Sequence, residues 1–380
     1  MQVNDLDHER LRRLAELRPR NGHKVLSVYM DLDPATFGTQ PARAAQVSSL
    51  LDAAERRIRA AAVDHATRCE LKQDLGRVRD VLRDGVSTKG AHALAVFASQ
   101  PSELFEVLRL PDAVPQTVVL NDTPWLDPLV GRGRTRRCVA LVSRRHLRVF
   151  ADTPDGSMRE VAELADDVPG QHDTGGLSQA NYERSIEEEV RKHLEHAAAA
   201  LFEQFRRRPF DQLAVGASAE LWPEFERMLH DYVRKRTLGR FDVDVERVNA
   251  EQALAAARPL FDAAVAEQLD GRLRRLQQAL AQGERAAGGL AAVLEALSER
   301  RVETLLYEAG FDSPGYVCPQ SGWLGVGPGA CPSGEGNAQP RENVLDDAIA
   351  AAIVQRADVF ALVDRPELGP HGGIAALLRF

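Results

Sequence analysis

Two adjacent glycines and a nearby glutamine form the stretch of the sequence with the clearest chemical potential. Gly175 and Gly176 are separated from Gln179 by only two residues in the segment TGGLSQ. A glutamine amide can orient a water molecule or an oxyanion, although it is a poor acid or base. The glycines are equally consistent with a surface connection that leads into a helix. Residue types alone leave both interpretations open.

Basic residues that could contact RNA phosphates gather in the same third of the chain. Residues 131–240 hold 19 basic and 18 acidic side chains, whereas the whole chain has a net charge of −8. The middle third is therefore the only region where we expect a locally positive surface, although exposed arginines without a function are common. The candidates are Arg184, Arg191, Lys192, Arg206, Arg207, Arg208, Arg234, Lys235 and Arg236.

Two cysteines suggest the remnant of a zinc ribbon. Cys318 and Cys331 begin the segments CPQSG and CPSGEG, which look like two halves of a ribbon that each lack the second cysteine. A structural zinc site uses four ligands, and His371 is the only other obvious candidate nearby. We therefore favour a degenerate ribbon that is kept as a loop, with the two thiols near each other, and treat metal binding as the weaker alternative.

Three other patterns do not predict a site. Glu189, His193 and His196 have helical spacing, but they are expected to be exposed polar residues because a metal site needs more ligands. The segment GVGPG does not lie between a strand and a helix, as a dinucleotide loop would. The segment GASAE lacks the last glycine of a nucleophile elbow. No cofactor is expected.

A long helix is predicted directly after the glycine pair. Apolar residues recur there mostly at every fourth position, which is typical of a helix that lies on a core. The opposite face carries the pairs Glu187 with Arg191 and Glu188 with Lys192, each worth roughly a few tenths of a kcal/mol. The apolar stripe comprises Tyr182, Ile186, Val190, Leu194, Ala198, Leu201 and Phe205.

Alternating strand and helix patterns predict an α/β protein with three consecutive α/β domains. Residues 1–132 contain the strand HKVLSVYMDL, helices near 42–62 and 66–82, the strands AHALAVFAS and LFEVLRL, and a Pro-rich exit segment. Residues 133–265 hold the glycine-containing loop and its helix among further strands. Residues 266–380 contain the strands RVETLLYEAG, VFALVD and GGIAALLRF, with an amphipathic helix after the first.

Composition excludes several classes of protein. The N-terminus lacks the apolar region of a signal peptide, and no apolar run approaches the ~18 residues that a membrane span needs. Four cysteines in 380 residues do not make a disulfide framework. A cytoplasmic protein without a membrane partner is therefore expected.

A glycine pair closely followed by glutamine and a long helix, in a central domain, resembles a known superfamily. It comprises the archaeal and eukaryotic class-1 peptide-chain release factors and their relative Pelota. Within it the chain looks most like the bacterial branch, which also resembles the Vms-type peptidyl-tRNA hydrolase. VLSVYMDLDP resembles the first domain of the bacterial members, and RRVETLLYEAG and GGIAALLRF resemble the third domain. The resemblance thus spans all three expected domains.

The resemblance implies a release-factor/Pelota-like architecture and an RNA-binding protein of the ribosomal A site, with rRNA and peptidyl-tRNA as partners. In release factors the loop glutamine orients water against the ester that joins peptide to tRNA. Gln179 would take that role, and Gly175 and Gly176 that of the glycine pair. The resemblance leaves open whether a translational GTPase such as elongation factor Tu delivers the protein.

The sequence departs from the release-factor pattern in two ways. Leu177 and Ser178 separate the glycines from Gln179, and residues 1–130 contain no counterpart of the stop-codon-reading motif. Vms-type enzymes also separate glycine from glutamine, whereas the relative Balon, a hibernation factor, occupies the A site without releasing peptide. Ester hydrolysis in ribosome rescue or quality control is the leading hypothesis. Non-catalytic A-site binding in hibernation or stress is the second, and a generic α/β protein is the third.

Overall fold

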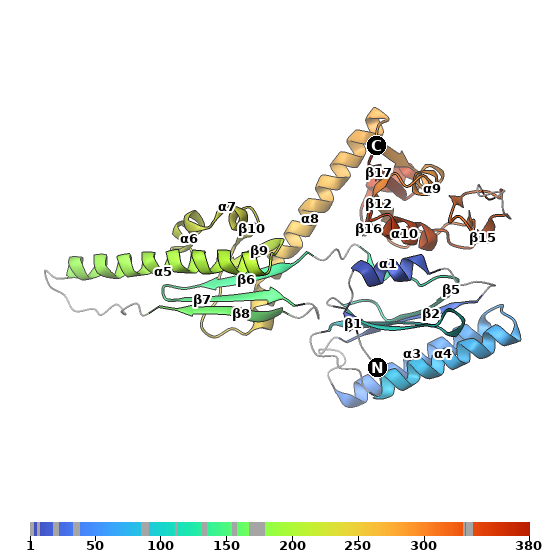
Figure 1. Ribbon diagram of the computed structural model, residues 1–380, viewed down its shortest axis with the longest axis horizontal. Helices are drawn as coiled ribbons and strands as arrows, with labels where there is room; N and C mark the ends of the chain where they lie inside the picture. Colours follow the sequence, from blue (N-terminus) through green and yellow to red (C-terminus); the bar gives the residue numbers. More distant parts are fainter. Residues whose placement is uncertain are drawn as a thin grey trace. The chain divides into compact units, whose positions relative to one another are not determined.

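The computed structural model divides the chain into two compact units (Figure 1). One unit comprises residues 1–133 and 272–380, and the other comprises residues 134–271. The mixture of helices and several sheets confirms the predicted α/β fold class. The division into three consecutive domains stays a prediction. The described residues are 4–5, 8–17, 23–32, 39–84, 91–110, 113–130, 135–153, 158–166, 179–329, 331 and 337–380.

The first part of the larger unit is a five-stranded sheet covered by two helices. Its strand order is β1-β4-β3-β2-β5, and all pairs are antiparallel except β1 with β4. Helices α3 and α4 bury Leu50, Ile58 and Leu71 in one hydrophobic cluster with Val28 and Val96 of the sheet. The elements are β1 Asn4–Asp5, α1 His8–Glu16, β2 Val25–Asp31, α3 Gln40–Ala60, α4 His65–Asp84, β3 Ala93–Ser99, β4 Leu104–Leu110 and β5 Thr117–Asn121.

Strand β5 corrects the interpretation of this region as a Pro-rich exit segment. It pairs with β2 at the edge of the sheet, and of its five residues only Val118 is buried. An edge strand with one buried residue has a weak alternation pattern, and nearby prolines are compatible with an edge position. The sequence pattern therefore lacked the signal of a strand.

The opposite face of this sheet shares a core with the C-terminal part of the chain. Tyr29 and Phe97 from the sheet and Leu14 from α1 join a cluster that also contains Val344. The Tyr29 ring meets Phe97 and Trp125 edge-on, at centroid distances of 5.9 and 5.4 Å. The first and last parts of the chain are thus held together by burial of large apolar side chains.

The C-terminal part contains every strand and the helix that its sequence predicts. Its main sheet has the order β11-β17-β12-β16, and a small sheet has the order β14-β13-β15. Strand β12 pairs parallel with β16 and antiparallel with β17. The elements are β11 Ala286–Gly288, α9 Leu290–Ser298, β12 Val302–Glu308, β13 Gly315–Val317, β14 Leu324–Gly325, β15 Gln339–Arg341, α10 Leu345–Val354, β16 Asp358–Leu362 and β17 Ile374–Leu378.

Two polar contacts lie within this shared unit. The Tyr307 hydroxyl donates a hydrogen bond to Asp127, and Asn121 Nδ2 donates to Asp346 Oδ2 at 2.6 Å. Burial, together with the charges of Asp347 and Asp127, raises the pKa of Asp346 from 3.8 to about 7. This carboxyl group therefore holds a proton in the folded protein under conditions in which it would ionise in the unfolded chain.

The smaller unit is a sheet with helices on both faces. Its strand order is β10-β9-β6-β7-β8 (Figure 1). Alternate residues of β6 show the two faces: Cys138 and Ala140 share a cluster with α5, whereas Val139 and Leu141 share one with Phe261 of α8. The elements are β6 Arg137–Val142, β7 His146–Asp152, β8 Met158–Ala165, α5 Gln179–Arg207, β9 Gln212–Gly216, α6 Trp222–Met228, α7 Asp231–Arg234, β10 Thr237–Phe241 and α8 Ala250–Gln282, whose residues from 272 onward belong to the larger unit.

Helix α8 continues through Pro259 and ends before Gly283, which has a positive φ of 68°. Glycine adopts this backbone conformation without strain, which suits a residue that ends a helix. Among the described helices, none combines the length and apolar composition that a membrane span requires.

The raised pKa of Asp346 predicts a pH-dependent stability of the larger unit. Folding takes up a proton between the unfolded pKa, about 4, and the folded pKa, about 7, so the free energy of unfolding falls as pH rises across this window. Asp346→Asn is expected to flatten this slope and to be more stable than wild type at pH 8 by about 1–3 kcal/mol. Urea unfolding at several pH values measures both effects. Asp52→Asn, at an exposed carboxylate of α3, serves as control, and a wild-type slope in Asp346→Asn would contradict the prediction.

Candidate functional site

Helix α5 has Gln179 as its first residue. The 29-residue helix buries Ile186, Val190, Leu194 and Leu201, which confirms the predicted apolar stripe over its described side chains. Because a helix rises 1.5 Å per residue, Gln179 lies about 10 Å along the axis before Ile186, the first buried side chain described on α5. The described packing thus anchors α5 from Ile186 onward, and Gln179 lies about two turns earlier in the same helix.

The catalytic roles predicted for the loop stay predictions. Gly175 and Gly176, and the side chain of Gln179, lie outside the described residues. The backbone at the start of α5 is described, and its first turn carries no acidic residue. The first N–H groups of a helix have no intrahelical acceptor and form its positive end, so this terminus favours a group that carries negative charge.

A buried histidine connects α5 to the strand that precedes the loop. His193 Nδ1 lies 2.7 Å from Asp166 Oδ2, and the His193 side chain is fully buried. The more exposed His196 approaches the same oxygen at 3.3 Å through its own Nδ1. Asp166 directly follows β8 and is the last described residue before the glycine-containing segment. The cluster therefore fixes one end of that segment to the middle of α5.

Charge on Asp166 is favoured by this contact. The hydrogen bond from His193 lowers the pKa of the Asp166 carboxyl below its ordinary value, and His196 lowers it further. When His193 Nδ1–H donates to the carboxylate, the neutral ring has an unprotonated Nε2. That atom is buried and has no hydrogen-bond partner among the residues that the structure describes.

The expectation that His193 is an exposed polar residue is wrong. His193 lies three residues after Val190 and seven after Ile186, so it falls on the apolar stripe of the helix. That spacing was the available signal in the sequence. The partner Asp166 was missed because helical periodicity says nothing about a contact with a residue 27 positions earlier.

We expect substitutions of Asp166 to destabilise the smaller unit. Asp166→Ala leaves His193 Nδ1 buried without its acceptor and should cost about 1–3 kcal/mol, whereas Asp166→Asn retains an acceptor and should cost less. A lowered carboxyl pKa contributes stability above the unfolded pKa of 3.8, and this contribution is lost as pH falls through the folded value. Urea unfolding should therefore show a deficit for Asp166→Asn at neutral pH that shrinks in acid. Glu220→Gln, with a side chain that is 82% exposed, is the control.

The predicted RNA-binding residues lie at the start, in the middle and at the end of α5 and on α7 with the residues after it, so they do not form one site. Arg184 is exposed near the start of the helix, whereas 206–208 lie at its end beside 234–236 from α7 and the residues after it. The axial separation of Gln179 from Arg206 is about 40 Å. A single ligand group therefore cannot contact both ends.

Ion pairs on the exposed face of α5 differ from the predicted ones. Arg191 lies between two carboxylates on the helix surface and pairs with both, so its predicted pairing with Glu187 is wrong. Lys192 correspondingly pairs one residue later than predicted. These carboxylates reduce the positive charge that Arg191 and Lys192 can offer to RNA. The pairs are Arg191–Glu188 at 2.7 Å, Arg191–Glu195 at 2.5 Å and Lys192–Glu189 at 3.0 Å.

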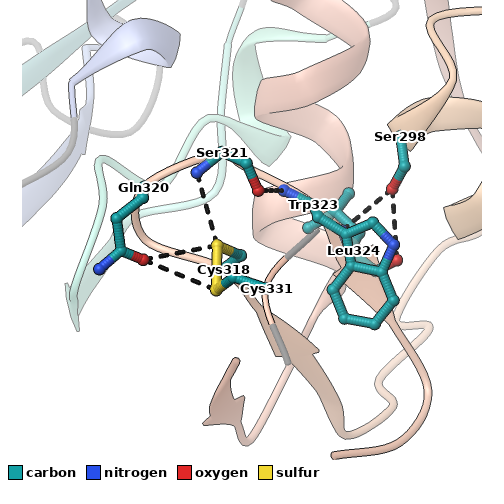
Figure 2. Close-up of a disulfide and its surroundings, with 7 residues drawn as sticks. All are labelled: Ser298, Cys318, Gln320, Ser321, Trp323, Leu324 and Cys331. Atoms are coloured by element: carbon teal, nitrogen blue, oxygen red, sulfur yellow. Dashed lines mark hydrogen bonds between the residues drawn. A yellow bond between two sulfur atoms is a disulfide. The ribbon is translucent and has the colours of Figure 1, made fainter. Parts of the chain in front are cut away.

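Cys318 and Cys331 form a disulfide, with Cα atoms 5.5 Å apart (Figure 2). Gln320 Oε1 lies 3.4 and 3.6 Å from the two sulfur atoms, and the Ser321 N–H donates to Cys318 Sγ at 3.5 Å. Sulfur atoms bonded to each other are not available as zinc ligands, which corrects the weaker metal alternative. Among the described residues, no group of three or more His, Cys, Asp or Glu side chains could hold a metal ion.

The disulfide predicts a measurable thiol count and stability. Cys69 and Cys138 are free, so the denatured, unreduced protein should give two thiols and the reduced protein four. Cys331→Ser should lower the free energy of unfolding by about 2–3 kcal/mol because the bond closes a short loop. Dithiothreitol should destabilise wild type and leave the variant unchanged. Four thiols before reduction would contradict the assignment.

The smaller unit contains the α/β sheet and the long helix beginning at a glutamine on which the resemblance to release factors in the sequence rests. Residues 124–262 match the family model for bacterial archaeo-eukaryotic release factor family 10. This match confirms the predicted similarity to the bacterial branch of the release-factor and Pelota superfamily. It includes Gln179 and all the predicted RNA-binding residues. No curated protein matches the sequence.

Solved structures of release factors and Pelota proteins are similar to the chain at low sequence identity. The archaeal translation termination factor aRF1 is 18% identical, with 99% of each chain covered and a TM-score of 0.26. Archaeoglobus fulgidus Pelota is 17% identical, covering 76% of this chain and 79% of that chain, with a TM-score of 0.35. Ribosome-bound archaeal Pelota is 14% identical, covering 100% and 95%, with a TM-score of 0.41. At these TM-scores the similarity carries no residue role to this chain.

Proposed function

We propose that the protein is a ribosome-associated, release-factor-like hydrolase of peptidyl-tRNA, with Gln179 as its catalytic residue. The observation that carries the proposal is the start of α5 at Gln179, about 10 Å along the axis before the first buried side chain described on the helix. This start lies within the residues that match the bacterial release-factor family. A glutamine in this position can enter the site of a partner while the rest of the unit stays outside.

In this proposal the protein supplies positioning and no nucleophile. The Gln179 amide orients a water molecule, whose oxygen attacks the carbonyl carbon of the ester. Negative charge develops on the carbonyl oxygen, and N–H groups at the start of α5 donate to it. The ester bond to the tRNA ribose then breaks, and the ribose oxygen leaves with a proton. Orientation and oxyanion stabilisation together are large enough effects to account for such catalysis.

The hydrogen bond between Asp166 and His193 acts on this site indirectly. It joins the residue before the glycine-containing segment to a helix position 14 residues after Gln179. Both ends of the segment are therefore attached to the same rigid body. We propose that this attachment limits the directions in which Gly175, Gly176 and Gln179 can be presented to the ester.

A second candidate function is non-catalytic occupation of the A site. Gln179 is part of a helix, and Leu177 and Ser178 separate it from the glycine pair. A residue in a helical backbone has less freedom to approach an ester than one in the glycine loop itself. These two observations favour a protein that binds idle or stalled ribosomes, in hibernation or stress, without freeing the peptide.

The proposed partners follow from both candidates. They are the ribosome, through rRNA and peptidyl-tRNA, and a translational GTPase, for which elongation factor Tu is the candidate to test. Two of the similar structures are named as ribosome-bound archaeal Pelota with ABCE1 and as S. cerevisiae Dom34 interacting with Hbs1. Among the predicted RNA-binding residues on the first half of α5, the exposed Arg184 lies nearest to Gln179 in the chain and is the first to test.

A peptide-release assay separates the candidates. Purified protein is expected to free nascent peptide from stalled ribosomes, and Gln179→Ala should slow release by about 100-fold or more, because the attacking water is no longer oriented. Co-sedimentation with ribosomes should not change, since the substitution removes no charge. Gln268→Ala, at an exposed glutamine of α8, is the matched control.

The outcomes decide between the two functions. Full release activity in Gln179→Ala would exclude the catalytic role of this residue. Ribosome binding by wild type without release would favour the A-site binder. If wild type shows no salt-sensitive ribosome binding, both candidates fail.

A further inference from the structure

Four aromatic rings form a continuous series at the C-terminal end of α5, which we call the ring ladder. Phe205 and Phe202 of α5 stack with centroids 6.5 Å apart and planes 17° apart. His230 stacks on Phe202 at 3.8 Å and 11°. Tyr232 follows His230 at 5.3 Å and 27°. The ring ladder thus consists of Phe205, Phe202, His230 and Tyr232, in that order.

Tyr232 is the outermost and most exposed ring of this series. Phe202 and Phe205 are partly buried against the core of the smaller unit, whereas His230 is exposed and Tyr232 is 58% exposed. Tyr232 stacks toward His230 on one side, and its exposure leaves ring surface that a further planar group can reach. A large aromatic surface left in water gains stabilisation when a ligand covers it.

Hydrogen bonds hold the exposed end of the ring ladder in place. The Tyr232 N–H donates to His230 Nδ1 at 3.3 Å, and Arg236 Nη1 donates to the Tyr232 carbonyl at 2.7 Å. The Arg236 guanidinium also lies 4.8 Å above the Phe205 ring. Because both backbone groups of Tyr232 are engaged, a ligand would meet a surface that is already ordered, which lowers the entropic cost of binding.

The two segments that carry the ring ladder are rich in basic residues, although the whole chain is acidic. Residues 201–208 and 229–236, which carry the rings, contain six basic and two acidic side chains. The two acids, Glu203 and Asp231, each pair with a neighbouring arginine. An anionic partner therefore meets cations whose charge is not cancelled. The exposed cations with no ion pair among the described residues are Arg207, Arg208 and Lys235.

We propose that the ring ladder binds an unpaired base of single-stranded RNA, which stacks on the open face of Tyr232. The flanking phosphates pair with the cations around it. Aromatic side chains beside a basic surface are the combination that binds single strands, because every base offers a π-face and every nucleotide a negative charge. Bases inside a duplex are stacked on one another and cannot reach the ring.

This inference rests on the proposed function, which makes RNA the partner. The part of that RNA contacted by the ring ladder is an unpaired base. An acidic peptide would match the positive charge but would gain little binding energy from the flat, exposed ring of Tyr232. Duplex RNA would match the charge equally well and would leave Tyr232 unused. The ring ladder therefore predicts a preference for an unpaired nucleotide over both.

Binding of a fluorescent oligonucleotide tests the proposal. The probe is a 12-nucleotide single-stranded RNA with 2-aminopurine at its centre, whose fluorescence falls when the base stacks on a ring. The full-length protein should quench it. Tyr232→Ala should weaken binding about tenfold, because one stacked base is lost. The fluorescence of the probe should then stay at the level of the free strand. Tyr232→Phe should retain both signals. Val265→Ala, at another exposed apolar residue of the same unit, is the control.

The phosphate contacts give a second readout. Arg207→Gln and Lys235→Gln should weaken single-stranded and duplex RNA alike, and each should reduce the salt slope of single-strand binding by about 0.7. Tyr232→Ala should leave duplex binding and the salt slope unchanged. This pattern separates stacking from charge and from a loss of folding, which a melting curve of each variant checks.

Three results would overturn the proposal. They are wild-type affinity in Tyr232→Ala, equal affinity of wild type for the single strand and for its duplex, and no binding of wild type to the single strand. The assay contains neither ribosome nor ester. Stacking without peptide release would therefore contradict only the proposed hydrolysis, and release without stacking would contradict only the ring ladder.

Discussion

The packing of α5 on its sheet is the contact on which both functional surfaces depend. Its apolar stripe, from Ile186 to Leu201, faces β6, β7 and β9, and this burial orders a helix whose length far exceeds the width of a small sheet. The first turn carries Gln179. The last turns carry the aromatic side chains that begin the ring ladder. Loss of one buried leucine here would affect both ends, although neither end contacts the other.

The larger unit is stabilised in a different way. Its core combines apolar side chains from both ends of the chain with the carboxyl groups of Asp127 and Asp346. Protonation of Asp346 near neutral pH removes a charge that burial makes costly. The unit therefore combines tight apolar packing with a stability that responds to pH within the physiological range.

Periodic features were predictable from the sequence, and contacts between distant segments were not. The strand and helix patterns of the C-terminal part and the stripe of α5 follow from local burial. Strand β5 was missed because only Val118 in it is buried, and the partner of His193 because the contact joins two different elements. Cys331 lies 13 positions after Cys318, and no spacing rule distinguishes a disulfide from two nearby thiols.

The continuity of α5 also fixes an angle. Each helical residue turns the chain by about 100°, so the rotational offset between Gln179 and Phe202 is set by the number of residues between them. One residue inserted between them would turn one end of the helix by about 100° relative to the other. Replacing an exposed side chain between them would not change this angle. A partner that engages both ends of α5 must therefore hold its two contact elements at one fixed rotation about the helix axis.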